Sequence, residues 1–305
     1  MDQHMTVLQF PGQGSQRVGM GKDLCARSPA AAAVFARADE LLGFPLSHLC
    51  FEGPAETLLD TRNTQPAVLT TSVAALRALE ERVGRPAFVA GHSVGEFSAL
   101  VAAGALDFEE ALLLVRQRGE LMHEAGARNP GGMAAVLGLD APQVEDVCSR
   151  VRENGGGYVG VACDNAPGQV VISGEERALQ IGMEAASAAG ARRVIRLAVS
   201  IAGHSPLMAG AAAAFRHILQ QVPICAPSVP VVANTTACPL VTPDQIREAL
   251  IHQLCRPIRW ASSIRWMICQ GVTHFVEAGP GDVLTGLLRR IDRAVERLTT
   301  TDALS

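Results

Sequence analysis

The chain has 305 residues, of which 48% are hydrophobic and 18% charged, a balance that can bury a large core and excludes a disordered chain. Its 26 Lys and Arg against 30 Asp and Glu give a net charge of −4 with no block of like charge, which argues against a nucleic-acid-binding surface. No apolar run reaches the ~18 residues of a membrane-spanning helix and residues 1–4 lack the basic start of a secretory signal, so we expect a cytoplasmic protein with no membrane association.

The chain begins with a predicted strand, a glycine-containing loop and a helix. Residues 6–10 form a short β-type run, and residues 11–16 read Pro-Gly-Gln-Gly-Ser-Gln. Ser28 is placed as the N-cap of an alanine-rich helix over 29–42, with proline at its first position and Gly43 at its end. This strand-loop-helix order is typical of an α/β fold.

A second predicted strand, residues 86–90, leads directly into Gly91-His92-Ser93-Val94-Gly95. This pentapeptide matches the G-x-S-x-G nucleophile elbow, in which a serine stands on a tight turn between a strand and a helix. A helical pattern follows over 97–103, as the elbow requires. Ser93 is therefore the candidate nucleophile, and the backbone N–H of Val94 is placed where it can face a developing oxyanion.

Residues 129–199 contain shorter elements in the order β-α-β-β-α-β, which is typical of a ferredoxin-like unit. We therefore predict an α/β fold with an α/β-hydrolase-like parallel-sheet body made of residues 1–128 and 200–305. The ferredoxin-like (βαββαβ) subdomain, 129–199, would be inserted in it, its last strand running over 193–199. The remaining predicted helices of the body lie at 64–81, 207–220, 243–254 and 261–269, and a last helix follows Gly281 and ends at about residue 290. The remaining predicted strands lie at 229–233 and 273–277, and residues 299–305 are expected to be a loose tail.

A nucleophilic serine needs a base, and histidine has the suitable pKa. His204 lies in a predicted loop between the last strand of the insert and a helix, where a catalytic side chain can be held, although a histidine there could also be a helix cap. His92 adjoins the nucleophile, but at the end of a strand we expect its side chain to point away and to be structural.

Several motifs occur in one order over nearly the whole chain. They are Phe10–Gln16 (FPGQGSQ), Gly91–Leu100 (GHSVGEFSAL), Arg118-Gly119, Asn165–Gly174 (NAPGQVVISG), His204–Met208 (HSPLM) and Gly279–Leu284 (GPGDVL). Together they resemble the malonyl-CoA:acyl-carrier-protein transacylases, including the free-standing acyltransferases of polyketide synthesis.

The resemblance implies roles for the matching residues. Ser93 would become acylated, and His204 would take its proton and later return one to the leaving thiol. The main-chain carbonyl of Gln253 would orient the histidine in place of a carboxylate. The backbone N–H of Gln13 would join that of Val94 in the oxyanion hole.

Arg118 matches the arginine that binds the malonyl carboxylate through two parallel hydrogen bonds, whereas without the resemblance it reads as a solvated helix charge. Asn165 is expected to help shape the pocket. Malonyl-selective polyketide acyltransferases often carry a phenylalanine directly before the histidine, and this chain has Gly203 there, which should enlarge the floor of the pocket.

The predicted function is transfer of a malonyl group from malonyl-CoA to the phosphopantetheine thiol of an acyl carrier protein by a ping-pong Ser-His mechanism. Fatty-acid, polyketide and malonate-degrading roles stay open. The main alternative is an acyl-carrier-protein thioester hydrolase with a larger acyl pocket, which Arg118 disfavours because an unpaired arginine beside an apolar chain is costly. A non-enzymatic scaffold role is weaker still, since the nucleophile, base and arginine are all present.

We expect a monomer that uses no cofactor besides these substrates. The eight cysteines are scattered without a CxxC pair, so neither a metal site nor a disulfide is expected.

Overall fold

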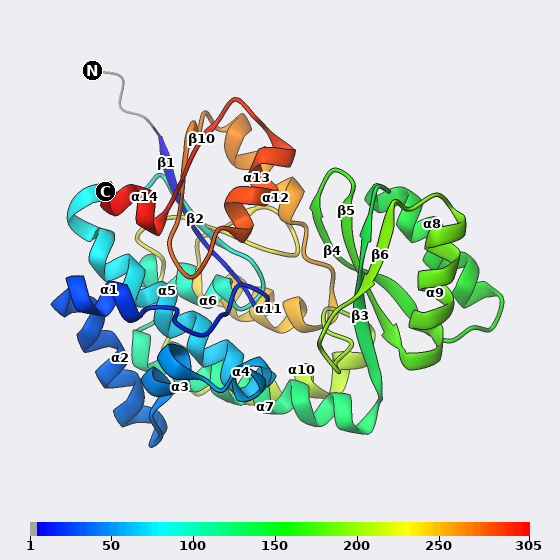
Figure 1. Ribbon diagram of the computed structural model, residues 1–305, viewed down its shortest axis with the longest axis horizontal. Helices are drawn as coiled ribbons and strands as arrows, with labels where there is room; N and C mark the ends of the chain where they lie inside the picture. The colour runs from blue at the N-terminus through cyan, green and yellow to red at the C-terminus, as the bar shows by residue number, and fades with distance from the viewer. Residues whose placement is uncertain (1–4) are drawn as a thin grey trace.

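The computed structural model describes residues 5–305, so residues 1–4, on which the expectation about a secretory signal rests, lie outside the described residues. The chain forms two separate sheets that lie side by side, each with its own helices (Figure 1). Within residues 5–305, no helix combines the length and the hydropathy needed to cross a membrane.

The larger sheet has the strand order β10-β9-β1-β2-β7-β8. Its strands are parallel except β8, which pairs antiparallel with β7. Their bounds are β1 Thr6–Phe10, β2 Phe88–Gly91, β7 Val231–Val232, β8 Pro239–Leu240, β9 His274–Glu277 and β10 Glu296–Thr299. Central strands of a parallel sheet are buried on both faces, which is why β1 and β2 are apolar runs.

Helices cover both faces of this sheet. A large hydrophobic core holds α2, α5, α6, α7, α10 and α11 against one face, and a smaller one holds α12 and α13 against the other. The bounds of the helices in this body are α1 Lys22–Arg27, α2 Pro29–Leu42, α3 Leu46–Glu52, α4 Ala55–Leu59, α5 Thr61–Val83, α6 Gly95–Ala102, α7 Phe108–Arg128, the 3-10 turn Pro206–Met208, α10 Ala209–Leu219, α11 Pro243–Cys255, α12 Trp260–Cys269, α13 Val283–Ile291 and α14 Thr300–Leu304.

The ends of α2 confirm the local reading of the sequence. The Ser28 hydroxyl accepts a hydrogen bond from the backbone N–H of Ala31, Pro29 stands at the first position, and Gly43 ends the helix with φ 69°.

The prediction of a loose tail at 299–305 is wrong. Thr299 ends β10 and, with Asp302, forms a capping box that starts α14. The hydroxyl of Thr300 accepts a hydrogen bond from Gly279 N–H (3.0 Å) and donates one to the carbonyl of Glu277 (2.9 Å), so the last helix is fastened to the end of β9.

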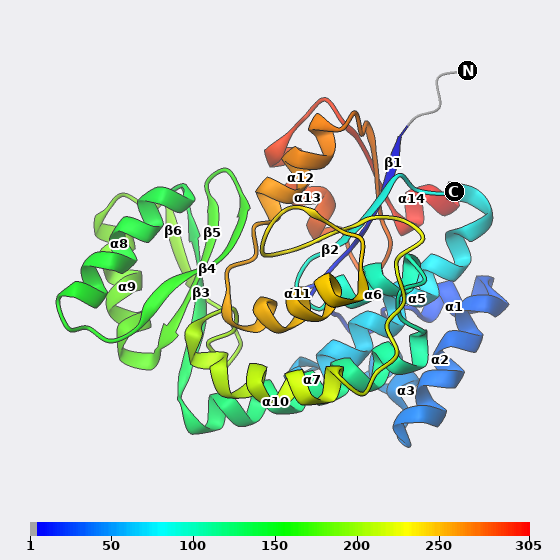
Figure 2. The same ribbon diagram turned by 180° about the vertical axis from the view of Figure 1, so that it is seen from behind.

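The second sheet has the order β4-β5-β3-β6 with every neighbour antiparallel, the arrangement of a ferredoxin-like unit. The bounds are β3 Gly131–Leu137, α8 Ala141–Glu153, β4 Val159–Ala166, β5 Gln169–Glu175, α9 Glu176–Ala188 and β6 Arg193–Arg196. Helices α8 and α9 pack on its outer face over a separate small core (Figure 2). The predicted fold class is confirmed, although β6 stops at Arg196 rather than at 199. We propose 129–199 as the limits of the insert, which the positions of β3 and β6 support.

The second sheet is joined to the larger body by backbone hydrogen bonds as well as by the chain crossings. Ile258, between α11 and α12, donates its N–H to the carbonyl of Ala162 (2.9 Å) and accepts one from Asp164 (2.8 Å), both on β4. These bonds hold β4 beside the carboxyl ends of β1 and β2, where the candidate site lies.

Candidate active site

The turn between β2 and α6 holds Ser93 in a strained backbone conformation, with φ 54°. The two flanking glycines are needed for close packing: a Cβ on Gly91 would lie 1.9 Å from the carbonyl oxygen of Gly95, and one on Gly95 would lie 2.2 Å from that of Phe10. The G-x-S-x-G pattern therefore forms a tight elbow that presents the serine hydroxyl above the sheet.

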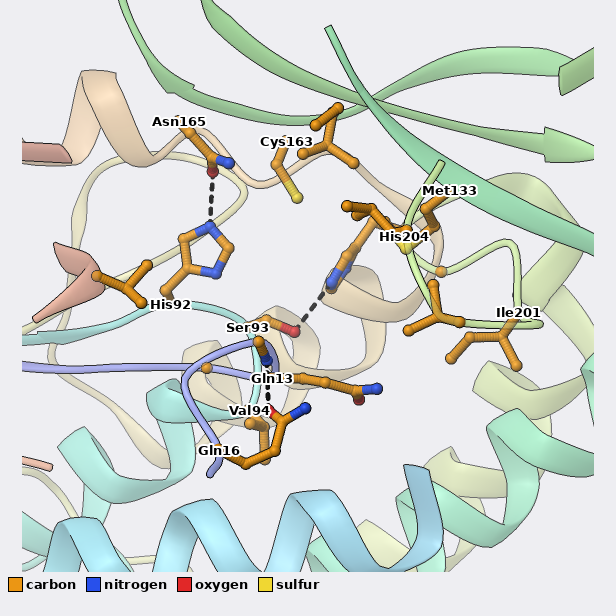
Figure 3. A pocket seen from close by; sticks show the side chains of 18 of the residues that line it. Gln13, Gln16, His92, Ser93, Val94, Met133, Cys163, Asn165, Ile201 and His204 are labelled. Carbon is orange, nitrogen blue, oxygen red and sulfur yellow. Dashed lines mark hydrogen bonds between the residues drawn. The ribbon is translucent and has the colours of Figure 1, made fainter. Parts of the chain in front are cut away.

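Ser93 and His204, 111 positions apart, meet across the end of the insert. The Ser93 hydroxyl oxygen lies 2.9 Å from Nε2 of His204 (Figure 3). Nδ1 of the same ring lies 2.6 Å from the backbone carbonyl oxygen of Gln253. Since a carbonyl only accepts, Nδ1 must carry the proton, which leaves the lone pair of Nε2 free to accept the serine proton.

The environment of His204 keeps its ring neutral. Burial and, to a smaller extent, the positive charge of Arg118 together lower the pKa of His204 to about 3. The backbone of His204 is also in the left-handed region, with φ 58°. The histidine is thus held in the protonation state of a base.

Two backbone N–H groups beside the serine are candidates for an oxyanion hole. Gln13 and Val94 both line the cavity, and in the described part of the chain neither N–H has a hydrogen-bond acceptor. The N–H of Ser93 is not available, because it donates to the side-chain oxygen of Asn234 (2.7 Å). The Asn234 amide in turn donates to the carbonyl of Gly91 (2.6 Å), so this asparagine holds the elbow from outside.

Arg118, on α7, is 1% exposed and lines the cavity, so it is not a solvated helix charge. Nη1 donates to the side-chain oxygen of Gln65 (2.6 Å), and Nη2 donates to that of Gln253 (2.9 Å). Among residues 5–305, Nε has no hydrogen-bond partner. Burial lowers the pKa of Arg118 to about 10, which still leaves it charged at neutral pH. A buried cation with unused donors is suited to bind an anionic group in the cavity.

Glu96 is a buried acid that sequence reasoning missed, because an acidic residue in the first turn of a helix is ordinarily solvated. Its carboxylate accepts hydrogen bonds from the N–H of Asn234 (3.1 Å) and from the side-chain amide of Gln253. Burial raises the pKa of Glu96 to about 7. Asn234 was missed as well, since it belongs to no motif and follows a two-residue strand.

The prediction that His92 points away from the site is wrong. Its ring lines the same cavity, with Nε2 2.8 Å from the side-chain oxygen of Asn165 (Figure 3). The ring also packs edge-on to the ring of Trp260. Burial lowers the pKa of His92. Asn165 comes from β4, so this contact brings the second sheet to the site.

The cavity has a volume of about 570 Å³ and is lined from both sheets. The space beside Gly203 is not empty: a Cβ there would lie 3.5 Å from Cε of Met122 and 3.6 Å from Sδ of Met133. Gly203, Met122 and Met133 all line the cavity, so the two methionine ends bound the space that the missing side chain leaves, and the enlarged floor stays a prediction. Cys163 also lines the cavity, and burial raises the pKa of its thiol to about 12. Within residues 5–305, no group of three or more His, Cys, Asp or Glu side chains is placed to hold a metal ion.

Comparison with known proteins identifies relatives over almost the full length. The model of the acyl transferase domain family matches residues 7–301. A malonyl CoA-acyl carrier protein transacylase of Bacillus subtilis is 47% identical over 96% of this chain and 92% of its own. The solved structure of a malonyl CoA-acyl carrier protein transacylase of Coxiella burnetii superposes with a TM-score of 0.95 at 40% identity, over 98% of this chain and 95% of that one. A malonyl-transacylase solved in complex with a type II polyketide synthase acyl-carrier protein superposes with a TM-score of 0.94 at 40% identity, over 98% of this chain and 97% of that one.

Proposed function

The chain belongs to the acyl transferase domain family, and on this basis we propose that it moves a malonyl group from malonyl-CoA to the phosphopantetheine thiol of an acyl carrier protein. The observation that carries the choice of acyl group is Arg118, a buried cation with unused donors in the cavity that Ser93 also lines. Such a cation favours an acyl group that ends in a carboxylate.

In the first half-reaction, Nε2 of His204 takes the proton of Ser93, and the serine oxygen attacks the thioester carbonyl of malonyl-CoA. The negative charge on the carbonyl oxygen would be stabilised by the N–H groups of Gln13 and Val94. The carbon–sulfur bond then breaks, and the coenzyme A thiolate leaves with the proton held by His204. The product is a malonyl ester of Ser93.

In the second half-reaction, His204 takes the proton of the carrier's thiol, and the thiolate attacks the ester carbonyl. The bond to the Ser93 oxygen breaks, and His204 returns the proton to that oxygen. Water must be excluded while the ester exists. Arg118 supports this by holding the malonyl carboxylate, and thus the carbonyl, in one pose.

The same proposal includes the partners and the setting. Serine-histidine acyl transfer needs only the two thioester partners, so no further cofactor is proposed. The nucleophile, base and arginine all come from one chain, which supports a monomer as the working unit. The carrier would serve fatty-acid or polyketide synthesis, and the proposed location is the cytoplasm, where coenzyme A thioesters are made.

Mass spectrometry of the protein after mixing with malonyl-CoA tests the proposal. We expect a malonyl adduct on Ser93 that persists until a holo carrier protein is added, and no adduct on the Ser93→Ala variant. Rapid loss of the adduct to water would instead support the thioester hydrolase. Absence of any adduct on the unaltered protein would refute both functions.

A further inference from the structure

We propose that Glu96 is a positioning residue that makes the site selective for acyl groups bearing a carboxylate, by orienting the side chain of Gln253 toward Arg118. This rests on the proposed malonyl transfer, because it concerns how the same site recognises the acyl group. Neither Glu96 nor the side chain of Gln253 touches the reacting atoms; both act through the groups that do.

Gln253 lies at the centre of the site's hydrogen bonds. Its backbone carbonyl accepts from Nδ1 of His204 (2.6 Å). Its side-chain oxygen accepts from Nη2 of Arg118 (2.9 Å). Its side-chain nitrogen donates to the carboxylate of Glu96 and to the backbone carbonyl of Ser93 (2.9 Å). One residue therefore contacts the base, the nucleophile's backbone and the arginine, and it is itself 0% exposed.

The partners of this amide permit only one of its two orientations. Arg118 can only donate, and an ionised Glu96 can only accept. If the amide were rotated by half a turn, its nitrogen would face the guanidinium and its oxygen would face the carboxylate, so both contacts would become repulsive. The carboxylate and the Ser93 carbonyl thus together hold the amide oxygen against Nη2, which fixes the plane of the guanidinium and leaves its remaining donors for the cavity.

The burial of Glu96 shows why a neutral residue would not serve equally well. Glu96 is 0% exposed, and its carboxylate is tied to Asn234 N–H (3.1 Å) as well as to Gln253. An acid in this position costs solvation energy that a glutamine would not, so its charge needs a compensating interaction. The hydrogen bonds from Asn234 and Gln253 and, to a smaller extent, the charge of Arg118 supply it, because all three lower the pKa of Glu96 against the larger effect of burial.

The Glu96→Gln variant tests the proposal. It keeps the shape, but its own side-chain nitrogen must face either Asn234 N–H or the side-chain nitrogen of Gln253, which are both donors, so one of the two contacts becomes repulsive. We would measure single-turnover acylation of Ser93 by malonyl-CoA and by acetyl-CoA, which lacks the carboxylate, in the unaltered protein and the variant. We expect the malonyl-to-acetyl rate ratio to fall about tenfold or more, as loss of an oriented contact to a charged group implies. Glu120→Gln is the matched control, since Glu120 pairs with Arg116 on the same helix as Arg118 and is half-exposed. Its ratio should not change.

A ratio within about twofold of the unaltered protein, with both rates lowered together or unchanged, would overturn the proposal. Failure of the unaltered protein to take up malonyl would refute the proposed function instead, so the two failures are distinct.

A second variant covers the case in which Glu96→Gln does not fold, as judged by its melting temperature. Gln253→Leu removes the side-chain amide and keeps the backbone carbonyl for His204, and it should lower the same ratio. Where Glu96→Gln does fold, its addition to Gln253→Leu should cause no further fall, because its effect passes through Gln253. An unchanged ratio in Gln253→Leu, or a further fall in the double variant equal to that of Glu96→Gln alone, would contradict the proposal.

Discussion

Replacement of Arg118 by alanine should separate recognition of the acyl group from the chemistry at Ser93. The guanidinium lies in the cavity but does not contact the Ser93–His204 pair, so truncation leaves the 2.9 Å contact between serine and histidine in place. The acyl groups that need the arginine are those with a free carboxylate. Malonyl transfer should therefore fall much more than acetyl transfer.

The size of the effect follows from the donors that remain unused. Two of the five guanidinium N–H groups are taken by Gln65 and Gln253, and Nε has no partner in the described residues. A carboxylate could take two of the others, each worth ~1.5–3 kcal/mol to a charged group. The pair amounts to ~3–6 kcal/mol, or a fall of about two to four orders of magnitude in kcat/KM for malonyl-CoA. Acetyl-CoA should lose less than about tenfold.

The assay is transfer from each coenzyme A thioester to a holo carrier protein, with kcat/KM measured for both. Arg116→Ala is the matched control: Arg116 is on the same helix but binds Glu120 (2.7 Å) and Asn63 (2.9 Å) and does not line the cavity. It should leave both values close to those of the unaltered protein. An equal loss on malonyl and acetyl in Arg118→Ala would refute the role of this arginine as the carboxylate-binding group.

Three further outcomes follow from the structure. The pKa of His204 is lowered to about 3, so the ring loses its base form only far below neutrality, and the rate of Ser93 acetylation by acetyl-CoA should stay constant from about pH 8 to 5. With an unperturbed histidine this rate would fall about thirtyfold over the same range. A fall of that size would contradict the argument that burial lowers the pKa. Gly91→Ala would place a Cβ 1.9 Å from the carbonyl oxygen of Gly95 and should destabilise the fold by about 3 kcal/mol or more. Gly210→Ala is the control, because a Cβ there has no neighbouring atom within 4 Å and should not destabilise the fold. Equal melting temperatures for the two variants would count against the strained elbow. Thr300→Val should cost about 1–3 kcal/mol in chemical denaturation, and no change would mean that the C-terminal helix contributes nothing.

Most of the fold follows from local patterns in the sequence. Short apolar runs followed by glycine-containing turns locate β1 and β2, and the β-α-β-β-α-β order indicates the ferredoxin-like sheet. The tail was mispredicted for a physical reason: residues 296–299 form an edge strand whose pairing with β9 depends on the folded sheet, which is not encoded in the local pattern. Helix α14 exists because that strand places Thr300 against the end of β9.

The residues of the site also divide into those that a local sequence pattern predicts and those whose roles depend on the folded structure. Ser93 was predictable because the elbow is a local backbone requirement. The loop position made His204 a candidate base, but a helix cap fitted it equally well until the resemblance assigned it the role of the base. Arg118 could be read only through resemblance, since nothing local distinguishes a buried helical arginine from a solvated one. Glu96 and Asn234 acquire their roles from tertiary contacts 138 positions apart, which no spacing rule reveals.

The strand order also sets when the protein can become active during synthesis. The nucleophile and its elbow leave the ribosome early. Strand β9, which pairs with β1 on the side away from β2, is synthesised only at residues 274–277, after His204 and Gln253. The second sheet, whose strands all lie between residues 131 and 196, can fold meanwhile. A nascent chain therefore carries Ser93 without its base or its orienting carbonyl, and it cannot capture acyl groups before the body closes.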